Sequence, residues 1–338
     1  MDPLSQAVVG ASCAQVFSNK KHFISATILG FLAGMAADLD VFIRSNEDPM
    51  LFLEFHRQFS HSLLFIPIGG LLCAGLFHLL FRNKTDVAFR YTYLYATIAY
   101  ASHGLLDSCT SYGTQLLWPF SNHRVSWDTI SIIDPILTLP LVFLIIFAAI
   151  KRSRRISIIA VAWIVLIQCF GFIQNQRASL IGHELAELRG HQVQRLNAKP
   201  SFANQLLWRL IYETDEGFYV DAIRLGLETE IIPGHFIRHL DIARDFPWLD
   251  KHSQQAKDIE RFRWFSQGYI AQDPQRPLRI IDIRYSLMPN EILGLWSIWL
   301  SPEADPKDHA DYRMDRDIDP RQRRAFFNLL FDSNQLQQ

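Results

Sequence analysis

The sequence is poor in several features that would assign it to a familiar class of protein. Its 338 residues include only four cysteines, none in a CxxC pair, so neither a zinc ribbon nor a disulfide framework is expected. The formal net charge is -1 and there is no basic stripe, so nucleic acid is not an expected partner. No positive charge precedes the first apolar residues, so we expect no cleavable signal peptide. A membrane location would therefore depend on the chain's own apolar segments.

Apolar segments are concentrated in residues 1–175, whereas residues 176–338 carry charges throughout. Residues 3–37 predict either a tightly packed helical hairpin or, if the second helix continues past Asp38, a further span. Four later runs approach the length of about 20 residues that crosses a bilayer. They are 62–81, 91–107, 130–150 and 156–174. We therefore predict an all-α polytopic membrane bundle of five to six helices over residues 1–175.

The second half has the pattern of a small α+β soluble domain. Residues 205–213 and 217–225 are rich in apolar and aromatic side chains and are separated by a polar turn, which predicts a β-hairpin. Residues 278–287 and 291–300 repeat the pattern around a Pro-Asn break. We expect residues 176–338 to form an extramembrane domain.

Basic residues fall in three short connections between the predicted spans. These hold Lys20 and Lys21, then Arg82, Lys84 and Arg90, and then Lys151, Arg152, Arg154 and Arg155. Alternating spans place all three connections on one side, which the positive-inside rule makes cytoplasmic. The acidic and histidine-bearing loops and the C-terminal domain would then lie on the periplasmic side of a bacterial inner membrane.

Candidate metal ligands lie at the ends of these spans. Asp38 and Asp40 are two residues apart, so both carboxylates can face one divalent cation. The alternative is that this Asp-Leu-Asp sequence merely ends a helix at the water surface. His56 and His61 flank Arg57, which suits two ligands and an arginine that binds an anionic group in bidentate fashion. The alternative here is a polar loop at the membrane interface.

A third candidate pair lies on a predicted helix. His103 and Asp107 are four residues apart and share one helix face, and ionisable groups within a membrane are costly unless functional or paired. They either bind the same ion or pair only with each other. Asp134, before Pro135, is a ligand, a partner that orients a histidine, or a helix N-cap. Arg124 lies on the correct side to assist anion binding.

Together these motifs resemble a known family, the bacterial inner-membrane metal-dependent hydrolases of the YdjM type, over about the first 175 residues. The matching motifs are Met1–Ala7, Gly34 with Asp38-Leu39-Asp40, His56-Arg57 with Ser60-His61-Ser62, His103–Asp107, Thr110–Thr114 and Ile133-Asp134-Pro135. Gln6 stands where some members have His, which leaves open whether this chain has one ligand fewer or uses the amide oxygen. The His/Asp pattern is more loosely similar to zinc-dependent phospholipases C, which suggests phosphoester chemistry.

These observations lead to one functional hypothesis and one alternative. The first is a membrane-bound hydrolase in which one or two divalent ions, expected to be zinc, activate water to attack a lipid or lipid-linked phosphoester. The expected ligands are Asp38, Asp40, His56, His61, His103 and Asp107, and the catalytic set adds Arg57 and Asp134. The alternative is a membrane scaffold or sensor with a structural metal and a partner-binding outer domain.

Overall fold

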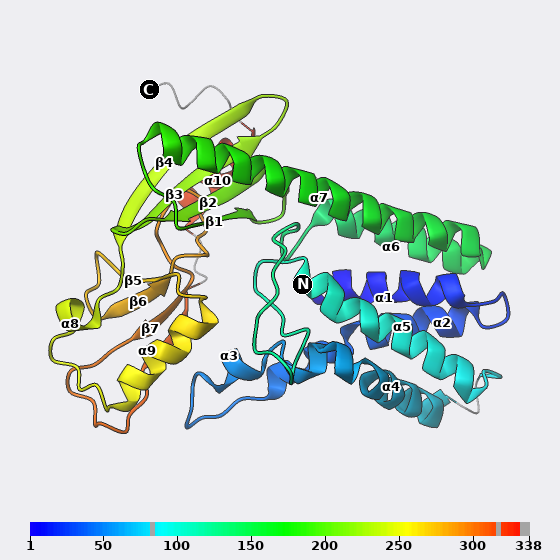
Figure 1. Cartoon of the computed structure of the whole chain (residues 1–338). Coiled ribbons are helices and arrows are strands. Elements are labelled where there is room, and N and C mark those ends of the chain that lie inside the picture. Colours follow the sequence, from blue (N-terminus) through cyan, green and yellow to red (C-terminus); the bar gives the residue numbers. More distant parts are fainter. Residues whose placement is uncertain (82–84, 316–318, 332–338) are drawn as a thin grey trace. The chain divides into compact units, whose positions relative to one another are not determined.

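The computed structural model describes residues 1–81, 85–315 and 319–331. Arg82 and Lys84, used above to predict orientation, lie outside the described residues. The chain folds into two compact units, which are coloured by sequence in Figure 1. The first comprises Met1–Ile43, Phe55–Ile173 and Phe202–Gln205, and the second Arg44–Glu54, Gln174–Ser201 and Leu206–Gln338. Their membrane and extramembrane assignments stay predictions.

Helices build the first unit. They are α1 (Pro3–Phe17), α2 (Phe23–Met35), α4 (Ile66–Phe81), α5 (Phe89–Ser108), α6 (Pro135–Lys151) and α7 (Arg154–Leu188), which continues into the second unit. Three short 3-10 helices, η1 (Ala36–Phe42), η2 (Phe59–His61) and η3 (Leu63–Phe65), follow α2 and precede α4. Figure 1 shows the α1–α2 and α6–α7 connections, which carry basic residues, at the same end of the helices.

Glycines let α1 and α2 pack backbone to backbone. A Cβ atom on Gly34 would lie 2.6 Å from the carbonyl oxygen of Gln6, and one on Gly30 would lie 2.8 Å from that of Gly10. Small residues at four-residue spacing permit this close approach of helices. The α1–α2 hairpin therefore forms, and the helical stretch that begins with α2 also continues past Asp38 as η1, so features of both predicted alternatives are present.

The predicted count of five to six spans is not confirmed. Among the described residues, three helical stretches are long and apolar enough to cross a membrane: Phe23–Phe42, Leu63–Phe81 and Arg154–Leu188. Helix α6 is apolar but has only 17 residues, a length of about 25 Å, short of the roughly 30 Å hydrocarbon core. Helix α5 is less apolar than these stretches, because it carries the polar side chains described below.

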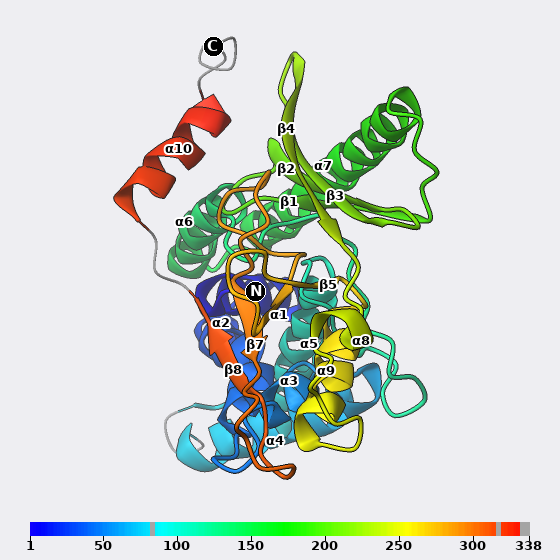
Figure 2. The ribbon, with the colours of Figure 1, turned by 90° about the vertical axis from the view of Figure 1, so that its left-hand side faces the viewer.

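Two four-stranded antiparallel sheets build the second unit (Figure 2). The first has the order β1 (Arg195–Pro200), β2 (Leu207–Glu213), β3 (Gly217–Leu225) and β4 (Thr229–Arg238). The other has the order β5 (Ile270–Gln272), β6 (Arg279–Asp282), β7 (Trp296–Trp299) and β8 (Asp311–Met314). The predicted β2–β3 hairpin is confirmed, since Glu213 pairs with Phe218. Strands β6 and β7 also pair, but they are shorter than predicted.

Helices accompany these sheets in the second unit. They are α3 (Leu51–Phe55), α8 (Ile242–Asp245), α9 (Gln254–Phe265) and α10 (Pro320–Phe331). Helix α9 buries Ile259, Phe262 and Phe265 on one face and is N-capped by Ser253, whose side chain accepts a hydrogen bond from the amide of Ala256. A helical N-terminal region followed by a domain of two small antiparallel sheets agrees with the predicted class.

Candidate metal centre

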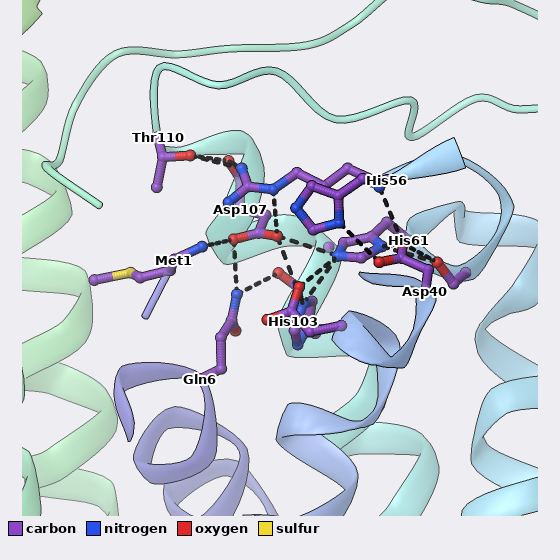
Figure 3. Close-up of polar contacts among 12 residues, drawn as sticks. Met1, Gln6, Asp40, His56, His61, His103, Asp107 and Thr110 are labelled. Atoms are coloured by element: carbon purple, nitrogen blue, oxygen red, sulfur yellow. Dashed lines mark hydrogen bonds and ion pairs between the residues drawn. The ribbon is translucent and has the colours of Figure 1, made fainter. Parts of the chain in front are cut away.

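Three elements of the first unit bring acidic and imidazole side chains to one point. Helix η1 carries Asp38 and Asp40, η2 carries His61, and the last turns of α5 carry His103 and Asp107. Figure 3 shows His61, His103 and Asp107 facing one another. The side chains of His61, His103 and Asp107 are 0% exposed, whereas that of Asp38 is 20% exposed. The cluster is thus buried, and Asp38 is its most accessible member.

Four potential donor atoms, from two aspartates and two histidines, lie within 4.8 Å of one another. The atoms are Oδ1 of Asp38, Nε2 of His61, Nε2 of His103 and Oδ2 of Asp107, and they form one group of potential metal ligands. The two imidazole nitrogens are 3.0 Å apart, and the four imidazole–carboxylate distances are 3.2, 3.4, 3.4 and 3.5 Å. A tetrahedron with metal–ligand bonds of about 2.0–2.1 Å has edges of about 3.3–3.4 Å.

Both histidines are oriented by their other ring nitrogen. Nδ1 of His103 lies 2.6 Å from the carbonyl oxygen of Gly34, and Nδ1 of His61 lies 3.1 Å from Oδ2 of Asp40. Each Nδ1–H therefore donates to an oxygen, which leaves the Nε2 lone pairs for the shared point. Two lone pairs 3.0 Å apart repel each other unless a proton or a metal ion lies between them.

The two carboxylate oxygens of Asp107 contact different groups. Oδ1 accepts a hydrogen bond from Nε2 of Gln6 at 2.8 Å and forms an ion pair with the α-amino group of Met1. Oδ2 is buried and faces Nε of Arg57 at 3.1 Å and the Nε2 atoms of His61 and His103 at 3.2 and 3.5 Å. Oδ2 is therefore the oxygen that Asp107 directs at the shared point. Gln6 presents its amide nitrogen to Asp107, so in this structure it orients a ligand.

Electrostatics favour positive charge at this point. Burial acts to lower the pKa of His61, but its hydrogen bonds with Asp107, Asp38 and Asp40 outweigh burial and raise the pKa to about 10. At His56 burial dominates and lowers the pKa, although a hydrogen bond to Asp40 opposes it. The carboxylates thus stabilise positive charge at the point where the two imidazole nitrogens meet.

Asp40 adjoins the cluster through His61, and His56 adjoins it through Asp40. With Asp38 they form another group of potential ligands. Both oxygens of Asp40 already accept hydrogen bonds, Oδ1 from His56 and Oδ2 from the hydroxyl of Ser60 and the amide of Arg57. This arrangement makes Asp40 a partner that orients His56 and His61.

Both arginines predicted to bind an anion are buried and donate hydrogen bonds to groups of the chain itself. Arg57 is 2% exposed, has a φ of 63°, and donates from Nη1 to Thr110 Oγ1 at 2.9 Å. A non-glycine residue in the left-handed region is unusual and is often found at functional sites. Arg124 is also buried, and its Nη2 donates to the carbonyl oxygens of His56 and Gly113.

Asp134 is the N-cap residue of α6. Its Oδ1 accepts hydrogen bonds from the amides of Ile136 and Leu137 and so caps α6, and its Oδ2 accepts one from Gln205. In the part of the chain that the structure describes, Asp134 belongs to neither group of potential ligands. Of the three roles considered for it, the structure shows the N-cap.

The sequence did not reveal the residues that hold the segment with Ser60 and His61 against α5. A Cβ atom on Gly104 would lie 2.4 Å from the carbonyl oxygen of His61, so only glycine admits the loop there. Tyr100 donates its hydroxyl hydrogen to the carbonyl oxygen of Ser60 at 2.7 Å. The glycine directly after His103 was the available signal, because a glycine inside a helix often marks the close approach of another backbone.

Apolar helices around a buried aspartate and histidine cluster define a membrane protein with a potential metal site. The model of the YdjM inner membrane protein family matches residues 1–178, more than half of the chain, and the protein belongs to this family. The family supports an inner-membrane location. The sequence resemblance to this family is therefore confirmed.

Two curated relatives are similar to the chain. YfhP of Bacillus subtilis (strain 168) is 23% identical over 300 residues, which cover 84% of this chain and 87% of the relative. The inner membrane protein YbcI of Escherichia coli (strain K12) is 36% identical over 81 residues, 23% of this chain and 44% of the relative. No solved structure matches. No phospholipase C is among these matches, so that likeness stays an analogy.

Proposed function

We propose that the protein is a membrane-bound hydrolase that depends on one divalent ion, zinc, held by Asp38, His61, His103 and Asp107. The observation that carries this proposal is the convergence of two imidazole nitrogens and two carboxylate oxygens, whose nitrogen–nitrogen and nitrogen–oxygen distances of 3.0 to 3.5 Å are close to the edges of a small tetrahedron. Nitrogen and oxygen donors in this mixture suit zinc. A second ion at Asp38, Asp40 and His56 is less well supported, because the oxygens of Asp40 are already engaged.

The proposed chemistry follows from which residues reach solvent. When bound, a zinc ion supplies a Lewis acid and lowers the pKa of a coordinated water. Asp38 forms the accessible side of the cluster, where water and substrate would approach. Asp40 holds His61 in position, and Arg57 fixes Asp107 through the 3.1 Å ion pair.

The surroundings of Asp38 favour an amphiphilic substrate. Leu39 and Phe42, on the same 3-10 helix, are 63% and 79% exposed. Exposed apolar side chains of this size beside a polar site are typical of a lipid-facing surface. We therefore propose a lipid or lipid-linked phosphoester as substrate and, from the charge parity of the connections, a periplasmic site and C-terminal domain.

Metal analysis of the purified protein tests the site. His61→Ala and Asp107→Ala should lose the bound ion, whereas the matched variants His78→Ala and Asp86→Ala should retain it, since Asp86 is exposed and pairs with Lys21. Unchanged metal content in the first two variants would refute the site. A screen of phospholipids and undecaprenyl phosphates should then show turnover that chelation abolishes and zinc restores.

One observation favours the alternative of a scaffold or sensor with a structural metal. Four protein ligands close the coordination sphere, as in structural zinc sites, whereas catalytic zinc usually has three. Fully loaded protein without turnover on any lipid, phosphoester or peptide would favour this alternative. Turnover that Asp38→Ala alters while the ion is retained would favour the hydrolase, since Asp38 is the accessible ligand.

A further inference from the structure

The segment between the two ligand-bearing loops is part of the second unit. The chain leaves the first unit after Ile43, three residues beyond Asp40, and returns at Phe55, directly before His56. The intervening residues Arg44–Glu54 belong to the second unit. The side chains of both Met50 and Leu53 in this segment are 1% exposed, so the segment is firmly built into the fold.

One arginine of α9 fastens this segment. Arg261 donates from Nη1 and Nη2 to the two oxygens of Asp48, at 3.0 and 2.7 Å, and from Nε to Glu54 at 2.6 Å. Its Nη1 also donates to Asp258 of the same helix at 3.1 Å. Bidentate arginine–carboxylate pairs are among the strongest and most directional ion pairs in proteins.

The two ends of the same segment are held together by Asp40, which is part of the cluster. Asp40 accepts hydrogen bonds from Nδ1 of His56 at 2.7 Å and from the amide of Arg57 at 3.0 Å, so the two ends of residues 41–55 are joined there. Asp40 also orients His61. A displacement of the segment would therefore act on Asp40, and through it on a proposed ligand.

We infer that Arg261 is a positioning residue through which the C-terminal unit sets the geometry and metal retention of the site. The inference rests on the proposed function, since it concerns the same ion. A change in the second unit that moves or releases Asp48 and Glu54 would weaken the contacts of Asp40 with His56 and Arg57. The C-terminal unit would thus regulate the metal centre without contributing a ligand.

Zinc release from the full-length protein tests this inference. The protein is loaded with Zn²⁺ in detergent, and release to a chromophoric chelator is followed over time. Arg261→Ala and Asp48→Asn should each accelerate release about 10-fold, as expected when a partner of a ligand is disturbed. The control Arg263→Ala, on the same helix and paired with exposed Glu260, should release zinc at the wild-type rate.

A spectroscopic readout separates positioning from general damage. The Co²⁺-loaded Arg261→Ala and Asp48→Asn proteins should show an altered visible absorption spectrum, and Arg261→Lys, which keeps a positive charge beside Asp48 and Glu54, should lie closer to wild type in both spectrum and release rate. Wild-type rates and spectra in Arg261→Ala and Asp48→Asn would overturn the inference. So would an effect of Arg261→Ala that neither Asp48→Asn nor Glu54→Gln reproduces, because it would then arise from α9 alone. A wild-type protein that binds no metal would instead overturn the proposed function.

Discussion

Both units bury charged side chains, but they satisfy them differently. In the second unit, Arg284 and Asp282 are almost fully buried and pair with each other through hydrogen bonds of 2.7 to 3.1 Å. Arg209 is likewise buried, and it donates to the carbonyl oxygens of Ile283 and Pro289. In the first unit, the buried oxygen Oδ2 of Asp107 and two imidazole nitrogens converge on one point, 3.0 to 3.5 Å from one another.

The difference separates structural from functional burial of charge. A buried ion pair whose two charges both belong to the chain needs no further charged component, although its net contribution to stability is small. A buried group of acceptors directed at one point is costly unless a cation is supplied. This contrast is the physical basis for expecting metal dependence in one unit and independence in the other.

The strongest test of the contrast is metal removal. Chelation of zinc-loaded protein should destabilise the first unit by several kcal/mol, since structural zinc sites bind with apparent free energies of about 10–16 kcal/mol. Amide hydrogen exchange should rise in η2 and the last turns of α5 and stay unchanged in β2 and β3. A uniform rise in both units would break the distinction.

Removing the buried Asp282–Arg284 ion pair should have the next largest effect on stability. Asp282→Ala leaves the guanidinium of Arg284 buried without its partner, which should lower the free energy of unfolding of the second unit by about 3–5 kcal/mol, with or without zinc. Asp311→Ala, which removes an exposed pair with Arg313, serves as the control and should cost less than about 1 kcal/mol. Chemical unfolding followed by circular dichroism measures both. Equal effects of the two variants would contradict the assigned role of burial.

Removing the partner of the histidines should weaken metal binding without abolishing it. Asp40→Asn retains all four proposed ligands but loses the carboxylate that orients His61, so zinc affinity should fall about 10- to 100-fold. Competition with a chelator gives the affinity, and Asp86→Asn is the exposed control. Complete loss of metal at saturating zinc would instead make Asp40 a ligand.

The smallest expected effect concerns pH and the segment that Arg261 fastens. Partial burial acts to raise the pKa of Asp48, but the hydrogen bond from Arg261 outweighs it and lowers the pKa below its usual range. A lowered folded-state pKa gives stability above the unfolded pKa of about 3.9, and this stability is lost as pH falls through the folded value. Asp48→Asn should therefore destabilise the second unit by about 1 kcal/mol or less near neutral pH. Unfolding curves in acid should converge with wild type, and a constant difference would contradict this assignment.

Part of this architecture was predictable because it follows from local chemistry. His103 and Asp107 share a helix face by spacing alone, and the β2–β3 hairpin follows from its polar turn. The division of roles between Asp38 and Asp40 was not predictable, because it depends on how η1 meets the loop. The role of Arg57 depends on a left-handed backbone conformation that the sequence does not signal.

The predicted number of spans was not confirmed for a related reason. Helix α5 was counted by its length, yet its polar residues face the interior of the first unit, and α7 continues to Leu188, well past the predicted end at residue 174. Hydropathy averages both faces of a helix and ignores what packs against each one. Tertiary contacts therefore contribute to deciding which apolar runs are spans.

Gly34 shows how closely packing and chemistry are joined in the first unit. Its Cα atom faces α1, where a side chain would meet the backbone of Gln6, and its carbonyl oxygen holds the ring of His103. Any larger residue would disturb a helix interface and an imidazole together. In a saturation-mutagenesis experiment, this position should tolerate substitution as poorly as the proposed ligands, although it contributes no donor atom to the ion.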